Sequence, residues 1–192
     1  MARSFTETEK DNICKKLITE CEKSWAAFGY KKTSIDELCT KVGISKGAFY
    51  LFFDSEELLF CSVLDGIQER LIVLTQETLS KTPTKADICQ MLKQIYLEYD
   101  KTNILTQRNT QDFANFMNRV SEEWKEKSKI LNDDFTVNTI FSTNLNLKMS
   151  TEKATGIFNA LLSILTNKDT LGYDHYEIFC TLLDSVINEI YE

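Results

Sequence analysis

Residues 33–60 place two short helical segments on either side of a glycine turn, and no other stretch constrains the fold as strongly. Ser34 begins an S-x-x-E capping box, which predicts a helix that ends near Gly43. Ser45 is a suitable cap for a second helix over residues 46–53. Because helices this short are marginal alone, they need neighbouring helices as support. The pattern is typical of a helix-turn-helix, which places one helix in the DNA major groove.

The rest of the chain predicts helices as well. One Pro and six Gly in 192 residues are few helix breakers, which argues against an all-β fold. Apolar residues recur at spacings of three and four in a series of segments, at residues 7–28, 56–80, 84–100, 110–131, 151–166 and 174–191. Residues 101–109 predict a short turn or helix, and residues 132–149 are rich in Asn and Thr, which weakens their helical signal. We therefore predict an all-α protein of about nine helices, with a three-helix N-terminal helix-turn-helix head and a larger helical body.

Charge is distributed unevenly between these two parts. Residues 1–55 hold nine Lys and Arg against eight Asp and Glu, so the head is close to neutral at +1. The total is −7, which leaves −8 on the remainder. An acidic body repels DNA and allows only the head to approach it.

The head also carries a longer motif over residues 29–59, GY-x-x-TS-ID-x-L-x-x-x-VGISKGAFY-x-x-F-x-S-x-E-x-L. This motif resembles the DNA-binding head of the TetR family of bacterial transcriptional regulators, and it covers about the first third of the chain. The resemblance implies a homodimer formed by the last two helices, a small-molecule effector bound in the body, and repression that the effector relieves. On this basis we assign residues 1–55 to DNA binding and residues 56–192 to ligand binding and dimerisation.

The second short helix supplies the chemistry that base and phosphate recognition needs. Lys46 can reach guanine acceptors or a phosphate, Gly47 permits close approach, and the Tyr50 hydroxyl can donate to a phosphate. Phe49 is either core or a base contact, and core is the preferred interpretation. Residues at the preceding helix N-terminus could also hold a phosphate, although Ser34 could serve as a cap alone. The predicted DNA contacts are Thr33, Ser34, Ser45, Lys46, Gly47, Ala48, Phe49 and Tyr50.

Three positions depart from the family pattern. The resemblance implies a polar or basic residue at position 51, His or Tyr at position 52, and a phosphate-contacting Lys at position 56. The chain has Leu51, Phe52 and Glu56 instead. We therefore expect fewer phosphate contacts and a shallower dependence of DNA affinity on salt.

The body carries many large apolar side chains on its predicted helical faces. Most of them should form core, and a subset should line the effector cavity that the resemblance implies. The candidates are Tyr96, Tyr99, Phe113, Phe116, Met117, Trp124, Phe141 and Phe158.

The last two helices have apolar faces wider than one core contact needs, which favours a four-helix bundle made by two subunits. The alternative is that these faces only seal the core of the monomer. The predicted dimer contacts are Ile157, Leu161, Leu165, Phe179, Leu183, Val186 and Ile190.

Other function classes lack residues to support them. His175 is the single histidine and is expected at the surface, and there is no nucleotide-binding glycine motif, so we predict no enzyme, no cofactor and no metal site. The six cysteines show no C-x-x-C spacing, which indicates buried thiols in a reducing cytoplasm, although a redox pair such as Cys14 and Cys21 stays open. No stretch is long and apolar enough for a membrane span. Two alternatives remain, a binding module whose head no longer reads DNA and a helical enzyme.

Overall fold

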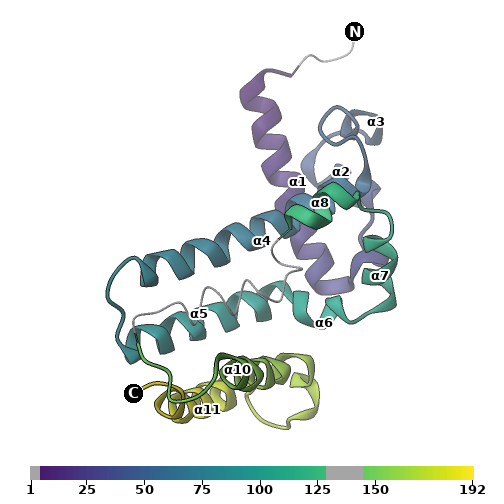
Figure 1. The fold of residues 1–192 in the computed structure, drawn as a ribbon. Helices are drawn as coiled ribbons and strands as arrows, with labels where there is room; N and C mark the ends of the chain where they lie inside the picture. Colours follow the sequence, from purple (N-terminus) through teal and green to yellow (C-terminus); the bar gives the residue numbers. More distant parts are fainter. Residues whose placement is uncertain (1–4, 129–144) are drawn as a thin grey trace. The chain divides into compact units, whose positions relative to one another are not determined.

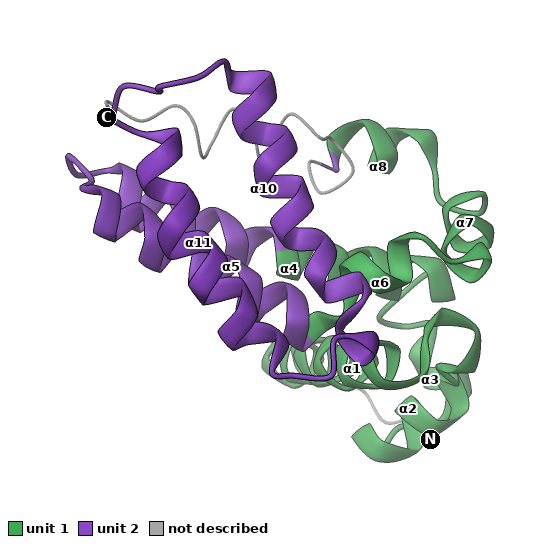
Figure 2. Ribbon diagram, turned by 90° about the horizontal axis from the view of Figure 1, so that it is seen from below, with its two compact units in different colours: residues 1–67, 102–127 green, residues 68–101, 128–192 purple. Residues whose placement is uncertain are grey.

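The computed structural model describes residues 5–128 and 145–192. This part of the chain contains ten α-helices, two short 3-10 helices and one isolated β-bridge between Leu147 and Tyr191, which confirms the all-α prediction. It divides into two compact units, Met1–Ile67 with Thr102–Lys127, and Gln68–Lys101 with Ser128–Glu192 (Figure 2). Residues 102–127 thus pack with the head, and the functional boundary at residue 55 stays a prediction.

The first unit is built from short helices around α1 (Figure 1). Its elements are α1 (Glu7–Phe28), η1 (Tyr30–Lys32), α2 (Ile35–Val42), α3 (Lys46–Phe49), the start of α4 (Glu56–Leu79), α6 (Ile104–Arg108), α7 (Gln111–Met117) and α8 (Glu122–Lys127). The α1 bounds are those that the sequence predicts. Its first turn is fixed by a capping box, in which Thr6 Oγ1 accepts from the Glu9 amide at 3.2 Å and Glu9 accepts from the Thr6 amide at 2.9 Å.

An aromatic cluster forms the core of the first unit. Trp25 of α1 meets Phe60 of α4 edge to face, with ring centroids 5.0 Å apart, and lies 5.6 Å from Phe116 of α7. Tyr30 closes the cluster at 4.6 Å from Phe60. Aromatic pairs at such distances stabilise beyond their area burial, so α1, α4 and α7 are held together here.

Two predicted helices differ from the observed ones. The segment predicted at residues 110–131 is split into α7 and α8, because Asn118 ends α7 and Ser121 Oγ accepts from the Trp124 amide at 3.3 Å to begin α8. The helix predicted over residues 46–53 is helical only to Phe49 and continues as turns.

The second unit packs two helical hairpins. It holds the end of α4, α5 (Lys85–Thr102, of which all but Thr102 lie in this unit), α10 (Thr151–Thr166), η3 (Lys168–Thr170) and α11 (His175–Ile190). The predicted cap at Thr84 is confirmed, since its Oγ1 accepts from the Asp87 amide at 3.3 Å. α5 and α11 meet through Tyr96 and Phe179, whose rings stack at 3.9 Å.

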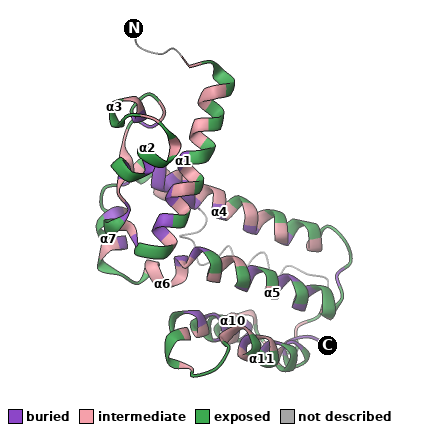
Figure 3. Cartoon of the chain, turned by 180° about the vertical axis from the view of Figure 1, so that it is seen from behind, coloured by how far each residue is buried: buried purple, intermediate pink, exposed green. Residues whose placement is uncertain are grey.

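Burial follows the helical periodicity in both units (Figure 3). Four of the six cysteines are buried, namely Cys21, Cys39, Cys61 and Cys89, and all six are free thiols. No helix of the described residues has the length and apolarity to cross a membrane.

Candidate nucleic-acid interface

α2 presents one apolar face to the first unit and ends in a tight turn. Ser34 caps it, with Oγ accepting from the Glu37 amide at 3.4 Å. Gly43 ends it in the left-handed region with φ of 80°, which a side chain disfavours, and its N–H donates to Cys39 O at 2.9 Å. This turn sets the direction in which α3 leaves α2.

α3 is fixed by one cap and one buried ring. Ser45 Oγ accepts from the Ala48 amide at 3.1 Å. The Phe49 side chain is fully buried and stacks on Phe53 at 5.7 Å. Because Phe49 faces inward, the opposite side of α3 is open to solvent. We call this open side the recognition surface, and it comprises Ser45, Lys46, Gly47, Ala48 and Tyr50.

The members of the recognition surface differ in exposure. Ser45, Lys46, Gly47 and Tyr50 are exposed and Ala48 is half-buried. The surface therefore combines a cation, two hydroxyls and small residues on one side of a single turn of helix, and these can contact phosphates and base edges.

Two predicted contacts have other tasks. Phe49 is core, because no part of its side chain is accessible, so its predicted DNA contact is wrong. Thr33 is buried as well, and its Oγ1 donates to Gly29 O at 2.9 Å while its amide donates to Tyr30 O at 3.1 Å. Both Thr33 donors are occupied within the turn after α1, so this residue cannot donate to a phosphate.

Lys46 forms an ion pair with a carboxylate that the sequence analysis did not single out. Asp36, on the exposed face of α2, accepts from Lys46 Nζ at 3.0 Å. This hydrogen bond and its charge raise the pKa of Lys46. Ten residues separate the pair in sequence, so only the packing of α2 on α3 brings them together.

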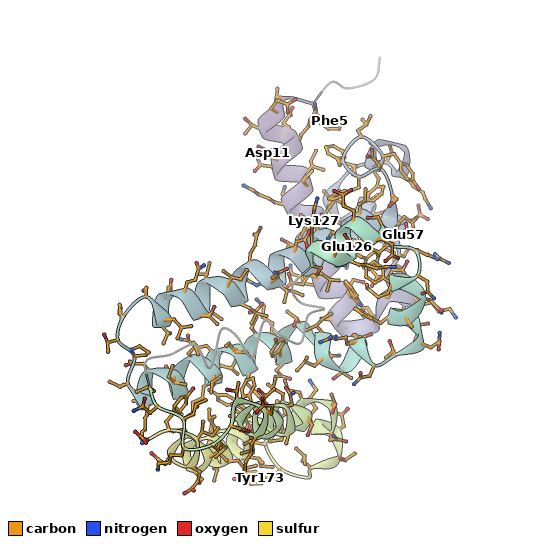
Figure 4. The ribbon with its side chains drawn as sticks, viewed as in Figure 1. Phe5, Asp11, Glu57, Glu126, Lys127 and Tyr173 are labelled. Atoms are coloured by element: carbon orange, nitrogen blue, oxygen red, sulfur yellow. The ribbon has the colours of Figure 1, made fainter. Side chains whose placement is uncertain are left out.

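The three departures from the family pattern have distinct surroundings. Leu51 is 67 % exposed, an unusual position for a large apolar side chain. Phe52 packs edge to face on Phe5, with ring centroids 5.5 Å apart. Figure 4 labels Phe5, which precedes α1. Glu56 is half-buried and borders a cavity described below. None of the three adds a cation to the recognition surface.

Residues 17–63 match the family model described as bacterial regulatory proteins, tetR family. The head is therefore similar to the DNA-binding part of TetR-family regulators. The match begins within α1, runs through η1, α2 and α3 and ends in α4, and it agrees with the resemblance that the head motif carries.

Relatives and solved structures of TetR-like proteins agree with this. The uncharacterized HTH-type transcriptional regulator YhgD of Bacillus subtilis is 32 % identical over 102 residues, which cover 52 % of this chain and 53 % of that protein. The chain spans about a quarter to a half of the length of the curated relatives it matches.

Two solved structures show the fold of the whole chain. A TetR transcriptional regulator from Chloroflexus aurantiacus superimposes with a TM-score of 0.68 at 14 % identity, covering 96 % of this chain and 98 % of that one. The regulator FadR from Bacillus subtilis, solved in complex with stearoyl-CoA, gives a TM-score of 0.60 at 13 % identity, covering 92 % and 98 %. At such identity the likeness concerns the fold alone.

The residues predicted to line an effector pocket divide between the two units. Phe113 and Phe116 belong to the aromatic core of the first unit, which also holds Met117 and Trp124. Trp124 Nε1 donates to Asp65 at 3.0 Å. The predicted effector-pocket residues are therefore divided between the two units, and the described residues of neither unit form one pocket lined by all of them.

The other predicted pocket residues lie in the second unit or outside the described residues. Tyr96 is buried against Phe179, Tyr99 is half-buried, and Phe141 lies outside the described residues. Phe158 is buried and, with Leu161 and Leu183, borders a cavity of about 10 Å³, too small for an effector.

Most of the predicted dimer contacts are already covered within the second unit. Five of the seven are buried there, namely Leu161, Leu165, Phe179, Leu183 and Ile190. They form core in the monomer, as the alternative interpretation held for them. Ile157 and Val186 are half-buried, and Leu182 is 44 % exposed. Dimerisation by α10 and α11 stays a prediction, and its contacts must come from these more exposed positions.

His175 is not the simple surface residue that we expected. Its Nδ1 lies 2.9 Å from the Tyr96 hydroxyl, and its Nε2 lies 3.7 Å from Asp100. Asp100 also accepts from Lys168 Nζ at 2.7 Å. The histidine therefore joins α5 to the first turn of α11. Among residues 5–128 and 145–192, no group of three His, Cys, Asp or Glu could hold a metal ion.

Proposed function

We propose that this chain is a sequence-specific DNA-binding transcriptional regulator whose head docks α3 in the major groove. The observation that carries the proposal is the recognition surface on a TetR-family head: one cation, hydroxyls and small residues stand on the open side of a helix whose other side is buried.

Each exposed group has a role in this proposal. Lys46 exchanges its ion pair with Asp36 for a contact to a phosphate or to guanine O6 and N7. The Tyr50 hydroxyl donates to a phosphate, and Ser45 adds a second hydroxyl. Gly47 leaves the backbone free to approach the bases. Ser34 contributes at the N-terminus of α2, where free N–H groups favour an anion.

We further propose a homodimer that a small molecule releases from its operator. The fold is that of regulators such as FadR, which was solved with stearoyl-CoA, and this supports ligand binding in the body. The effector can shift the DNA-bound population only by its differential affinity for the two conformations. Repression is the sign that the family resemblance implies.

The test compares DNA retardation by the wild-type chain with that by Lys46→Ala combined with Tyr50→Phe. We expect retardation of specific genomic fragments in the presence of competitor DNA, and its loss in the double variant. The matched control is Lys153→Ala with Tyr173→Phe, which removes the same groups from exposed positions in the second unit. Equal retardation by all three proteins would refute the proposed interface.

A second candidate is a binding module whose head no longer reads DNA. Leu51, Glu56 and the acidic total favour it. Binding to heparin and to pooled duplex DNA at low salt distinguishes the two, because even weak nonspecific binding strengthens as salt is lowered. Failure to bind either would favour the second candidate.

A further inference from the structure

The first unit contains a polar cavity that DNA recognition does not use. Its volume is about 250 Å³, and it lies where η1, the first turn of α4 and α7 meet. Phe60 forms an apolar part of its wall, and the Tyr30 side chain borders it. This volume is below the roughly 300–1,000 Å³ of sites for drug-sized ligands, so a smaller molecule fits it.

The charges around this cavity are mixed and mostly uncompensated. Glu56 and Asp112 border it, and neither makes an ion pair with any described residue. Lys31 also borders the cavity and is likewise without a carboxylate partner among the described residues. Arg119 also borders the cavity, where it pairs with Glu57 at 3.6 Å and interacts with the Tyr30 hydroxyl.

The helix dipole explains only part of this arrangement. Glu56 and Asp112 stand in the first turns of α4 and α7, where a carboxylate is favoured. The dipole does not require both carboxylates to border one cavity, nor does it place two cations on the same cavity. Glu56 and Asp112 are half-buried and Lys31 and Arg119 are exposed, so a ligand that carries both charges can add charge-assisted hydrogen bonds to all four side chains.

We propose that this cavity binds a free α-amino acid. Glu56 and Asp112 accept hydrogen bonds from its ammonium group. Lys31 and Arg119 donate to its carboxylate, and Phe60 contacts its side chain. An amino acid presents both charges on one small molecule, whereas a simple amine or a simple carboxylate would leave one pair of the lining charges unmatched.

The test is calorimetric titration of the full-length protein, without DNA, by individual proteinogenic L-amino acids. We expect at least one to bind with a Kd in the micromolar to millimolar range, on the order of small-ligand affinities. Its amide and its deaminated acid should each bind about tenfold more weakly or worse. Because DNA is absent, the outcome is independent of the proposed regulatory function.

Three variants locate the site. Glu56→Gln and Asp112→Asn should each weaken binding about tenfold. The control Glu122→Gln changes a first-turn carboxylate of α8, exposed and paired with Lys125, and should leave binding unchanged. The side-chain amide resonance of Asn115, which borders the cavity, should shift on titration.

Three results would overturn the proposal: no binding by any amino acid, binding that both variants retain, or an amide or deaminated acid that binds as tightly as the amino acid itself. The Asn115 resonance keeps the test decisive even if a variant folds poorly, because it is followed in the wild-type protein.

Discussion

Lys46 is the one cation of the recognition surface, and in the free head Asp36 holds it at 3.0 Å. DNA binding must exchange this carboxylate for a phosphate or a base edge. Since both side chains are largely exposed, the ion pair is weak and the exchange costs little. In the free head, Lys46 is therefore paired with a carboxylate that a DNA phosphate can replace.

Asp36→Asn should strengthen DNA binding by about two- to fivefold, because it frees Lys46 and removes a negative charge near the phosphates. Titration of labelled duplex by fluorescence anisotropy measures this. Glu37→Gln is the control, since it removes an exposed carboxylate from the same turn without touching Lys46. If Asp36→Asn improves affinity equally in a Lys46→Met background, release of Lys46 is not the cause.

The two glycines of the helix-turn-helix differ in what they permit, and substitution separates their roles. Gly43 has φ of 80° and open space around it, so Gly43→Ala meets no clash and costs only backbone strain. We expect a loss of about 1–2 kcal/mol in the free energy of unfolding. Denaturant titration measures it, and an unchanged unfolding midpoint would contradict the observed turn.

Gly47→Ala should act in the opposite way. Gly47 lies in α3 without positive φ, and an added Cβ would meet only Ser45 Oγ at 3.9 Å. We expect stability to rise by up to about 1 kcal/mol, while DNA affinity falls because the added methyl holds the backbone away from the bases. Unfolding and anisotropy titrations of the same sample separate the two effects. Unchanged DNA affinity would show that the backbone at Gly47 does not approach the bases closely.

At the scale of helices, α5 and α11 are joined by a carboxylate that responds to acid. Asp184 accepts from Cys89 Sγ at 2.9 Å and from Lys93 Nζ at 2.7 Å. These hydrogen bonds lower the pKa of Asp184, and burial raises the pKa of the Cys89 thiol to about 11. A lowered folded-state pKa stabilises the fold above the ordinary value near 3.8, and the stabilisation is lost as pH falls through the folded-state value.

Asp184→Asn should therefore flatten the acid side of the stability curve. The free energy of unfolding of the wild type should fall more steeply below about pH 4 than that of the variant. Denaturant titrations at several pH values measure the slopes. Asp169→Asn, an exposed carboxylate in η3 of the same unit, is the control. Parallel acid slopes for wild type and Asp184→Asn would exclude this contribution.

Sequence periodicity and caps predicted single helices well but not their mutual packing. The bounds of α1 and α10 and the Thr84 cap are local features, and the structure agrees with them. The break between α7 and α8 was missed because Asn118 and Ser121 compete for the backbone within an apolar period. The packing of residues 102–127 in the first unit and the Asp36–Lys46 pair depend on contacts distant in sequence, which periodicity does not report.

For the whole molecule, the proposed dimer would decide how strongly the head binds DNA. One short helix with a single cation binds weakly, and two heads held together gain by effective concentration. Because Phe179 and Leu183 already fill the core of the second unit, we expect a dimer formed through α11 to use the exposed face of that helix. Leu182, 44 % exposed, is the large apolar side chain on that face.

Leu182→Lys should give a folded monomer. Sedimentation should show loss of the dimer, and operator affinity should fall tenfold or more. The melting temperature should change little, since Leu182 is not core. Thr181→Lys adds the same charge one position away on an exposed site and should leave the dimer intact. A dimer that survives Leu182→Lys would place the interface elsewhere.

We propose that two such heads, held together in a dimer, read a specific DNA sequence. Selection of duplexes from a random pool by the full-length protein at low salt tests it most directly. We expect one enriched palindromic motif, with half-sites about one helical turn or roughly 34–36 Å apart, and no enrichment by Lys46→Ala combined with Tyr50→Phe. Failure of the wild-type protein to enrich any motif, or equal enrichment by the double variant, would contradict it.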